Sequence, residues 1–286
     1  MNRFAAQIAP AIIGVLMAFL CPQTSAEPLR WTNSLGQVFV LVPGTKVLFS
    51  VWETRVKDFA AFAATNPKLD GTNWNHALYH NVTPVSAGPD YPVVDVSWND
   101  AQAFCRWLTE TERKTGKIPA NAVYRLPSDE EWSVAVGIGD RETNGTPKEK
   151  SAKLADVYPW GTQFPPPSGA GNFADQTAKA YFTNWPSINN YTDGFATTAP
   201  VGSFAPNQFG LYDLAGNALE WCEDKYDPAH EQRVLRGGGW NNTGPKSLLS
   251  SYREHVAPNR YSVITGFRCV LEGRPDLMGG NGGSAK

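Results

Sequence analysis

Hydrophobic residues recur with two different periods along the first half of the chain. Residues 36–49 hold two short runs of β-forming residues separated by Pro43 and Gly44, a pattern that predicts a β-hairpin. From Val51 to Ala63 the apolar residues recur at near-helical spacing. We therefore expect a hairpin followed directly by an amphipathic helix.

A second helix is predicted after Ser97 or Asn99, either of which could cap its N-terminus. It should end at Gly116, because glycine favours the backbone conformation that stops a helix. Its apolar face comprises Ala101, Phe104, Cys105 and Leu108. This periodicity points the Cys105 thiol inward.

A third helix is predicted from its capping signal. Ser128 is followed three residues later by Glu131, the spacing of a capping box. The apolar face continues through Trp132, Ala135 and Val136, and Gly137 marks the end. A third helix is therefore expected between Ser128 and Gly137.

From Gly137 to about Ala199 the sequence loses this periodicity and becomes rich in glycine, proline, asparagine, threonine and aromatic residues. A loop of this length is either disordered or held by metal ions and aromatic packing. The aromatic content argues against disorder. The residues concerned are Trp160, Phe164, Phe173, Phe182, Trp185, Tyr191 and Phe195.

The first 26 residues read as a signal peptide. Arg3 precedes an apolar run, residues 8–20, that is too short to span a bilayer, and the small residues Ser25 and Ala26 suit cleavage before Glu27. A lipid anchor at Cys21 is the competing interpretation, but the residues just before it are bulky. We therefore expect a periplasmic or secreted protein with one domain over residues 27–272 and a flexible Gly-rich tail over residues 273–286.

Composition narrows the classes of partner. The chain has 25 basic and 27 acidic residues without a long block of either sign, which argues against nucleic acid or, after signal cleavage, a membrane as partner. Ten Trp, 26 Gly and 22 Pro with 18% charged residues predict a loop-rich domain held by large aromatic side chains. We expect little regular secondary structure.

Three cysteines follow the signal segment: Cys105, Cys222 and Cys269. An odd number in an oxidising compartment predicts one pair and one spare thiol. The chain's four histidines form no metal-ligand spacing with these cysteines, so a structural zinc site is not expected.

Several phrases occur in a recognisable order along the chain. They are Y-P-V-V-D-V-S-W-N-D-A-Q-A-F-C from Tyr91, Y-R-L-P-S-D-E-E-W from Tyr124, Y-P-W-G from Tyr158, G-N-F from Gly171, D-G-F from Asp193, A-P-V-G-S-F-A-P-N-Q-F-G-L-Y-D-L-A-G-N-A-L-E-W from Ala199, R-V-L-R-G-G-G-W from Arg233 and G-F-R-C from Gly266. From about Phe39 to Val270 the chain resembles the sulfatase-modifying-factor domain of formylglycine-generating enzymes. The resemblance implies one compact, loop-rich domain of mixed α and β (α+β) structure, with unusually little regular secondary structure and a fold related to C-type lectins.

The resemblance also implies two structural calcium ions. The first would be bound by the side chains of Asn172 and Asp193 and the carbonyls of Phe173 and Phe195. The second would be bound by the side chains of Asp213 and Glu220 and the carbonyls of Gly216 and Ala218. Hard oxygen donors beside glycine-permitted turns suit calcium. Taken singly, each of these side chains could equally be a turn or capping residue.

The resemblance further implies a disulfide between Cys105 and Cys269, against the alternative that both are buried free thiols. Cys222 is expected to be a buried spare thiol.

The resemblance fails at the catalytic cysteines. The family's enzymes carry two cysteines five residues apart that bind copper(I) and the substrate thiol. Asn242 stands at the first position, and residues 243–251 offer no second cysteine. Neither asparagine nor serine can replace a thiolate as a copper(I) ligand. We therefore expect no copper and no conversion of a sulfatase cysteine to formylglycine.

A ligand cleft is still expected around the substituted positions. Arginines could clamp a carboxylate or sulfate there and aromatic rings could stack on a planar ligand, or the arginines could pair with buried carboxylates and the rings belong to the core. For Arg268 the buried pairing is favoured. The cleft residues are Arg236, Trp240, Asn241, Asn242, Tyr252, Arg253, Glu254, His255 and Arg268.

Two functions follow from this interpretation. The first is a non-catalytic, calcium-stabilised module that binds a peptide, glycan or small molecule. The second is an enzyme with cysteine-independent chemistry, such as oxidative maturation of a siderophore chromophore, for which Glu254 and His255 are the nearby acid or base candidates. Fold alone does not decide between them.

Overall fold

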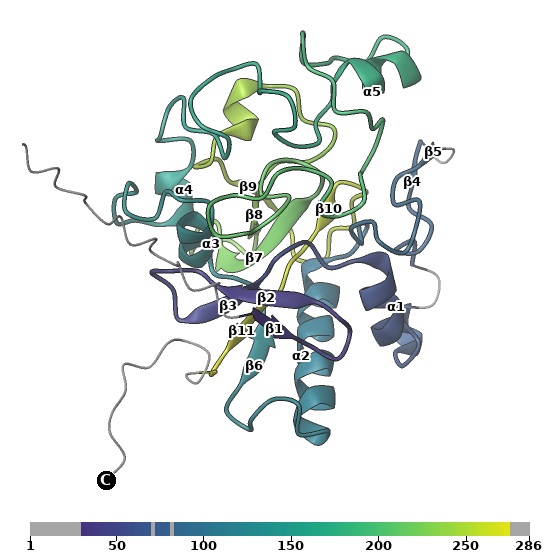
Figure 1. The fold of residues 1–286 in the computed structure, drawn as a ribbon, viewed down its shortest axis with the longest axis vertical. Helices are drawn as coiled ribbons and strands as arrows, with labels where there is room; N and C mark the ends of the chain where they lie inside the picture. Colours follow the sequence, from purple (N-terminus) through teal and green to yellow (C-terminus); the bar gives the residue numbers. More distant parts are fainter. Residues whose placement is uncertain (1–29, 70–71, 81–82, 275–286) are drawn as a thin grey trace, which may run out of the picture.

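The computed structural model describes residues 30–69, 72–80 and 83–274. The expected signal peptide and residues 275–286 of the expected tail lie outside these ranges. In the described part of the chain, no helix has the length and apolar character needed to cross a membrane. The structure is a mixed α+β fold in which more of the described chain lies in irregular segments than in helices and strands (Figure 1).

A five-stranded antiparallel sheet forms one side of the molecule. Its order is β1 (Arg30–Thr32), β2 (Val38–Leu41), β3 (Val47–Ser50), β11 (Val270–Glu272) and β6 (Val123–Arg125). The predicted hairpin is confirmed as β2 and β3. The sheet joins distant parts of the sequence, because β11 near the C-terminal end of the described chain lies between β3 and β6 (Figure 1).

Two helices cover this sheet. Helix α2 (Trp98–Lys114) begins at the predicted cap, where the Ser97 hydroxyl accepts a hydrogen bond from the Asp100 N–H at 3.2 Å. Its predicted apolar face is buried in the main core. Helix α1 (Val56–Ala63) starts later than its apolar pattern indicated. Val51 instead continues the strand pairing, with its N–H donating to the Val38 carbonyl.

A four-stranded sheet lies beside this core, with the order β10 (Thr265–Gly266), β7 (Leu219–Lys225), β8 (Arg233–Arg236) and β9 (Glu254–Val256). Helix α3 (Asp129–Ala135) packs against β7 and has the predicted capping box of Ser128 and Glu131.

The remainder is dominated by irregular chain, as predicted. It holds the short helices α4 (Pro147–Lys150) and α5 (Gln176–Tyr181), the hairpin β4 (Leu78–Tyr79) and β5 (Thr83–Pro84), and two 3-10 turns, Pro67–Leu69 and Pro245–Leu248. Figure 1 shows α5 at the upper right, above the four-stranded sheet, and α4 to the left of that sheet near α3. Aromatic contacts tie these connections together, for example the stacked rings of Tyr158 and Trp160 at 5.0 Å.

Candidate functional site

The first expected calcium set converges in the loop-rich part. Asn172 is fully buried, and its amide nitrogen donates to the Thr197 carbonyl at 2.7 Å, while its Oδ1 has no hydrogen-bond partner. The Asp193 carboxylate accepts the backbone N–H groups of Phe173 and Phe195, both at 2.9 Å. Burial raises the pKa of Asp193 to about 7 against these hydrogen bonds. Asp193 is therefore hydrogen-bonded to both phenylalanines of the set, and the buried amide oxygen of Asn172, next to Phe173 in the chain, lacks a donor.

The second expected set surrounds Asp213. Its Oδ2 accepts the Gly202 N–H at 2.7 Å, and its buried Oδ1 has no partner. Burial raises the pKa of Asp213 to about 6. Glu220 is engaged differently, because Arg268 binds both of its carboxylate oxygens at 2.7 and 2.5 Å and the Trp132 indole N–H donates to it at 3.0 Å.

Arg268 therefore forms the buried ion pair that the sequence favoured. The Glu220 carboxylate is already neutralised and hydrogen-bonded in this arrangement. Its assignment to a calcium ion stays a prediction.

Glu53 is a buried carboxylate that the sequence analysis did not identify. Its Oε1 accepts the Ala218 N–H at 2.9 Å and its Oε2 accepts the Asn217 amide at 2.6 Å. Burial, together with the charges of Asp213 and Glu220, raises its pKa well above the ordinary value. The one sequence signal for Glu53 was an acidic residue within an otherwise uncharged stretch directly after β3.

These buried oxygens provide the test of whether the chain fits calcium. Within the described ranges, no group of three or more His, Cys, Asp or Glu side chains is arranged to hold a metal ion. A cation would therefore need amide and carbonyl oxygens as well, which is the donor set calcium accepts. The unpartnered Oδ1 atoms of Asn172 and Asp213 fit that requirement.

The expected cleft arginines are buried rather than open. Arg236 and Arg253 are 0% and 1% exposed, and both bind Asp129, with Nη1–Oδ1 at 2.6 Å and Nη2–Oδ2 at 2.9 Å. Arg253 also binds Glu142 at 2.7 Å. This differs from the expected anion clamp, because two carboxylates from distant parts of the sequence already occupy both guanidinium groups.

Trp240 and Asn242 also have structural partners. Trp240 is 1% exposed, and its ring contacts Tyr79 and Trp185 with ring centroids at 5.3 and 5.4 Å. The Asn242 Oδ1 accepts the Gly239 N–H at 2.7 Å and so closes a turn. The ring expected to stack on a ligand is instead part of an aromatic core cluster.

The acid and base candidates lie next to one another on β9. The Glu254 carboxylate accepts the Tyr252 hydroxyl at 3.1 Å and the His255 N–H at 3.0 Å. The His255 ring stacks on Tyr226 at 3.8 Å, and its buried Nδ1 has no partner.

The three cysteines are buried and unbridged in the structure. The Sγ atoms of Cys105 and Cys269 lie 3.5 Å apart, which places the expected pair together. Burial raises the pKa of the Cys105 and Cys222 thiols well above the ordinary value. The bond between Cys105 and Cys269 stays a prediction.

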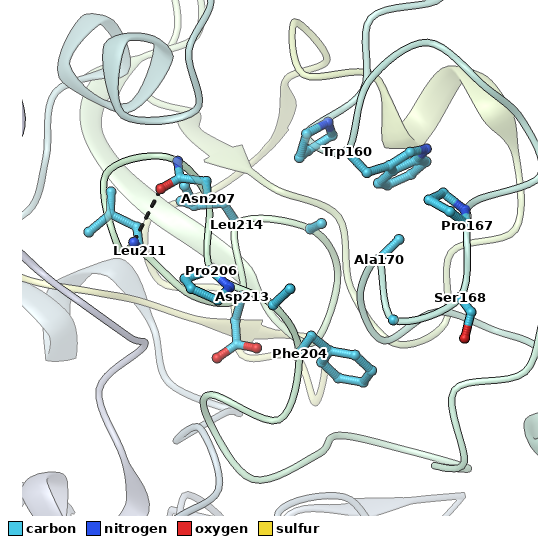
Figure 2. Close-up of a pocket in the computed structure, with 14 residues that line it drawn as sticks. Trp160, Pro167, Ser168, Ala170, Phe204, Pro206, Asn207, Leu211, Asp213 and Leu214 are labelled. Atoms are coloured by element: carbon cyan, nitrogen blue, oxygen red, sulfur yellow. Dashed lines mark hydrogen bonds between the residues drawn. The ribbon is translucent and has the colours of Figure 1, made fainter. Parts of the chain in front are cut away.

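A cavity of about 220 Å³ lies beside Asp213 of the second expected calcium set. Figure 2 shows Trp160, Pro167 and Ala170 on one side of this space, Pro206 and Leu214 on the other, and Phe204 below. Its lining is mainly apolar, with Asp213 its one ionisable residue. Sequence reasoning did not identify this cavity, since its walls come from loops without periodicity.

Comparison with known proteins agrees with this geometry. A bovine (Bos taurus) protein named inactive C-alpha-formylglycine-generating enzyme 2 is 35% identical over 195 residues, covering 65% of this chain and 52% of that protein. Bovine formylglycine-generating enzyme is 31% identical over 227 residues, covering 72% and 50%. The chain thus spans about half the length of these relatives.

Two solved structures share the fold at low sequence identity. PvdO from Pseudomonas aeruginosa superposes with a TM-score of 0.57 and 19% identity, covering 87% of this chain and 100% of that chain. Treponema denticola variable protein 1 gives a TM-score of 0.51 and 18% identity, covering 86% and 100%.

The family model described as "Sulfatase-modifying factor enzyme 1-like domain" matches residues 46–273, a range that contains both expected calcium sets, the thiol pair and the Asn242 turn. The chain belongs to this family of formylglycine-generating-enzyme-like proteins.

Proposed function

We propose that this chain is an exported, calcium-stabilised binding module of its family that does not carry out thiol-dependent oxidation. The observation that carries the proposal is Asn242. It stands where the family resemblance expects a copper-binding cysteine, and its side chain closes a turn through the Gly239 N–H at 2.7 Å. The side chain at this position therefore stabilises the local backbone turn.

The remaining thiols support the same conclusion. Cys105 and Cys269 are neighbours in the main core, and Cys222 lies in a separate buried cluster. A copper(I) site needs two accessible thiolates that converge. Burial raises the pKa of both Cys105 and Cys222, which keeps these groups as neutral thiols. The similarity to relatives named inactive formylglycine-generating enzyme 2, at 35% identity, also favours a protein without the oxidase reaction.

Calcium would be held by Asn172 and Asp193 in the first set and by Asp213 in the second. The support is the buried, unpartnered Oδ1 atoms of Asn172 and Asp213, because a buried polar atom without a partner is costly. A bound calcium ion supplies positive charge and directional coordination, and so orders the loops that carry these groups.

Two measurements test the proposal. Elemental analysis of the purified protein should find calcium, and titration with copper(I) should find no tight site. A peptide carrying a sulfatase-type cysteine should keep its mass after incubation with the protein, copper and oxygen. Tight copper binding or conversion of the peptide cysteine would refute the proposal.

A gain-of-function control uses the same positions. Ser247 lies five residues after Asn242, so Asn242→Cys combined with Ser247→Cys recreates the spacing of the family's cysteine pair. We expect this double variant to bind copper(I) while each single variant does not. If neither the double variant nor the wild type binds copper, the residues around the two introduced cysteines also differ from those of the enzymes.

One observation favours the second candidate, an enzyme with cysteine-independent chemistry. His255 has a buried ring nitrogen, Nδ1, without a partner, and such a nitrogen could accept or donate a proton in catalysis. The test is oxygen uptake with reduced precursors of siderophore chromophores. Uptake that disappears in His255→Gln would favour this candidate over the binding module.

A further inference from the structure

A small cavity of about 140 Å³ lies next to α4 and is lined by Glu142, a partner of the buried Arg253. Three of its six lining side chains are cationic. The lining comprises Arg141, Glu142, Thr143, Lys150, Lys153 and Leu154. Neither the expected calcium sets nor the Asn242 turn contributes to it.

The single carboxylate in the lining is already used. Glu142 binds the Arg253 guanidinium at 2.7 Å, and the same interaction lowers its pKa against the effect of burial. Its negative charge therefore does not offset the cations of the cavity. A ligand entering this space would meet an excess of positive charge.

The buried network behind the cavity is close to neutral. Three carboxylates, those of Asp129, Glu142 and Asp224, face three cations, those of Arg236, Arg253 and Lys150. Arg141 and Lys153 add two further positive charges at the cavity. Neither of these two side chains forms a hydrogen bond or ion pair with the described part of the chain.

Unused donors converge on the cavity. The Lys150 ammonium has three N–H donors and lies 3.3 Å from Asp129 and 3.6 Å from Glu142, which leaves one donor for a ligand. Arg141 offers a guanidinium fork, the group best suited to bidentate binding of an oxyanion. Thr143 adds a hydroxyl. Cationic groups, a guanidinium fork and a hydroxyl around one cavity are the features of a phosphate, sulfate or carboxylate site.

The size of the cavity limits what it can hold. Whole small-molecule sites measure roughly 300–1,000 Å³, so a space of about 140 Å³ takes one charged group of a larger ligand. Arg141 also lines an adjacent cavity of about 290 Å³, whose walls include Val136, Val157, Tyr158 and Pro159. The body of the ligand would extend past Arg141 into this second cavity, in which Arg141 is the one charged lining residue.

We propose that these two cavities form one binding site for a small organic oxyanion, with the anionic group between Arg141, Lys150 and Lys153 and an apolar or aromatic body against Tyr158. The inference rests on the proposed role as a binding module and names its class of ligand. It involves no calcium ligand and no position of the missing cysteines.

The test is calorimetric titration of the purified chain with phenyl phosphate, inorganic phosphate and phenol. Phenyl phosphate should bind at least about 10-fold more tightly than either fragment, since it alone fills both spaces. Phenyl sulfate and benzoate, titrated in parallel, identify which oxyanion is preferred. Binding should weaken as salt is added, because exposed charges are screened.

Two exposed positions allow substitution without breaking the buried network. Arg141→Gln and Lys153→Gln should each weaken phenyl phosphate binding by roughly 10-fold, the effect of losing one charge-assisted hydrogen bond. Lys148→Gln is the matched control, because Lys148 also belongs to α4 but pairs with Asp227 at 2.8 Å and does not line the cavity. It should leave the affinity unchanged.

Three outcomes would overturn the inference: equal affinity for phenol and phenyl phosphate, unchanged binding in both cavity variants, or an equal loss in Lys148→Gln. Binding of inorganic phosphate as tightly as phenyl phosphate would also overturn it, by showing that the adjacent cavity takes no part. None of these results bears on copper binding or peptide oxidation. Failure here is therefore distinguishable from failure of the proposed function.

Discussion

The core beneath the five-stranded sheet and the loop-rich segment of residues 138–218 are ordered by different interactions. In the core, α1 and α2 bury a continuous apolar cluster, within which Phe59 and Phe104 stack at 5.8 Å. In the loop-rich segment, single buried polar side chains such as those of Asn172 and Asn217 form two or more hydrogen bonds each. Substitutions in the core should therefore lower the stability of the whole fold, whereas substitutions in the loop-rich segment should destabilise only that segment.

The largest effect is expected from Phe104→Ala. Phe104 is fully buried and contacts Phe59, Phe62 and Phe267, so its removal leaves a cavity in the main core. We expect the free energy of unfolding, measured in urea, to fall by about 3–5 kcal/mol. Phe104→Leu should lose much less. A loss below about 1 kcal/mol for the alanine variant would contradict a core held by apolar burial.

The next effect concerns the buried ion pairs that connect the two regions. Asp129→Asn leaves Arg236 and Arg253 without their shared carboxylate, and should cost about 3 kcal/mol. Burial alone would raise the pKa of Asp129, but the charges of Arg236 and Arg253 outweigh it and hold this pKa well below its ordinary value.

The lowered pKa of Asp129 determines how the stability of the fold depends on pH. In the acid range the unfolded chain binds a proton at Asp129 that the folded chain does not, so stability rises with pH there. The contribution of Asp129 is present above about pH 4 and is lost as the pH falls below it. Urea unfolding at pH 7 and pH 3 should show a smaller difference for Asp129→Asn than for wild type. An equal difference would contradict the ion-pair assignment.

A smaller, local effect is expected from the first calcium set. Chelation, or Asp193→Ala, should lower the free energy needed to open the segment from Ala155 to Ala199 by about 1–3 kcal/mol. The substitution removes the acceptor of the Phe173 and Phe195 N–H groups, and chelation removes the positive charge next to that acceptor. Limited proteolysis and hydrogen exchange should localise the change. Asp156→Ala, in the same segment, serves as the control and should have no such effect. Proteolysis that a chelator leaves unchanged would refute the calcium assignment.

The smallest effect is expected at a helix cap. Ser97→Ala removes the acceptor for the Asp100 N–H at the start of α2 and should cost about 1 kcal/mol. Ser97→Thr should retain most of the stability. Thermal unfolding of the two variants measures the difference, and an alanine variant as stable as the threonine variant would contradict the capping role.

The contrast between the two regions also explains what the sequence could predict. The hairpin, the caps at Ser97 and Ser128 and the buried face of α2 were all predictable, because periodicity and capping depend on residues a few positions apart. The start of α1 was misplaced at Val51, since its spacing fits a helix but its N–H pairs with β2.

The candidate site was less predictable, because its contacts join distant segments. The sequence left open whether Arg253 clamps a ligand or pairs with buried carboxylates, because its partners Asp129 and Glu142 lie more than a hundred residues earlier in the chain. The cationic cavity beside α4 has the same origin. Arg141, Lys150 and Lys153 show no regular spacing, and only the folded loop brings them around one space.

Asn217 has a consequence for the ageing of the protein. Its side chain donates to Glu53 and accepts from Asn172 and the Ala199 N–H, so it needs one donor and one acceptor end. Deamidation to aspartate would remove the donor and place a second carboxylate against Glu53. The reaction begins with attack by the following backbone nitrogen, that of Ala218, which here donates to Glu53 at 2.9 Å within a fully buried site. The fold thus protects from deamidation an asparagine whose amide nitrogen and oxygen are both hydrogen-bonded.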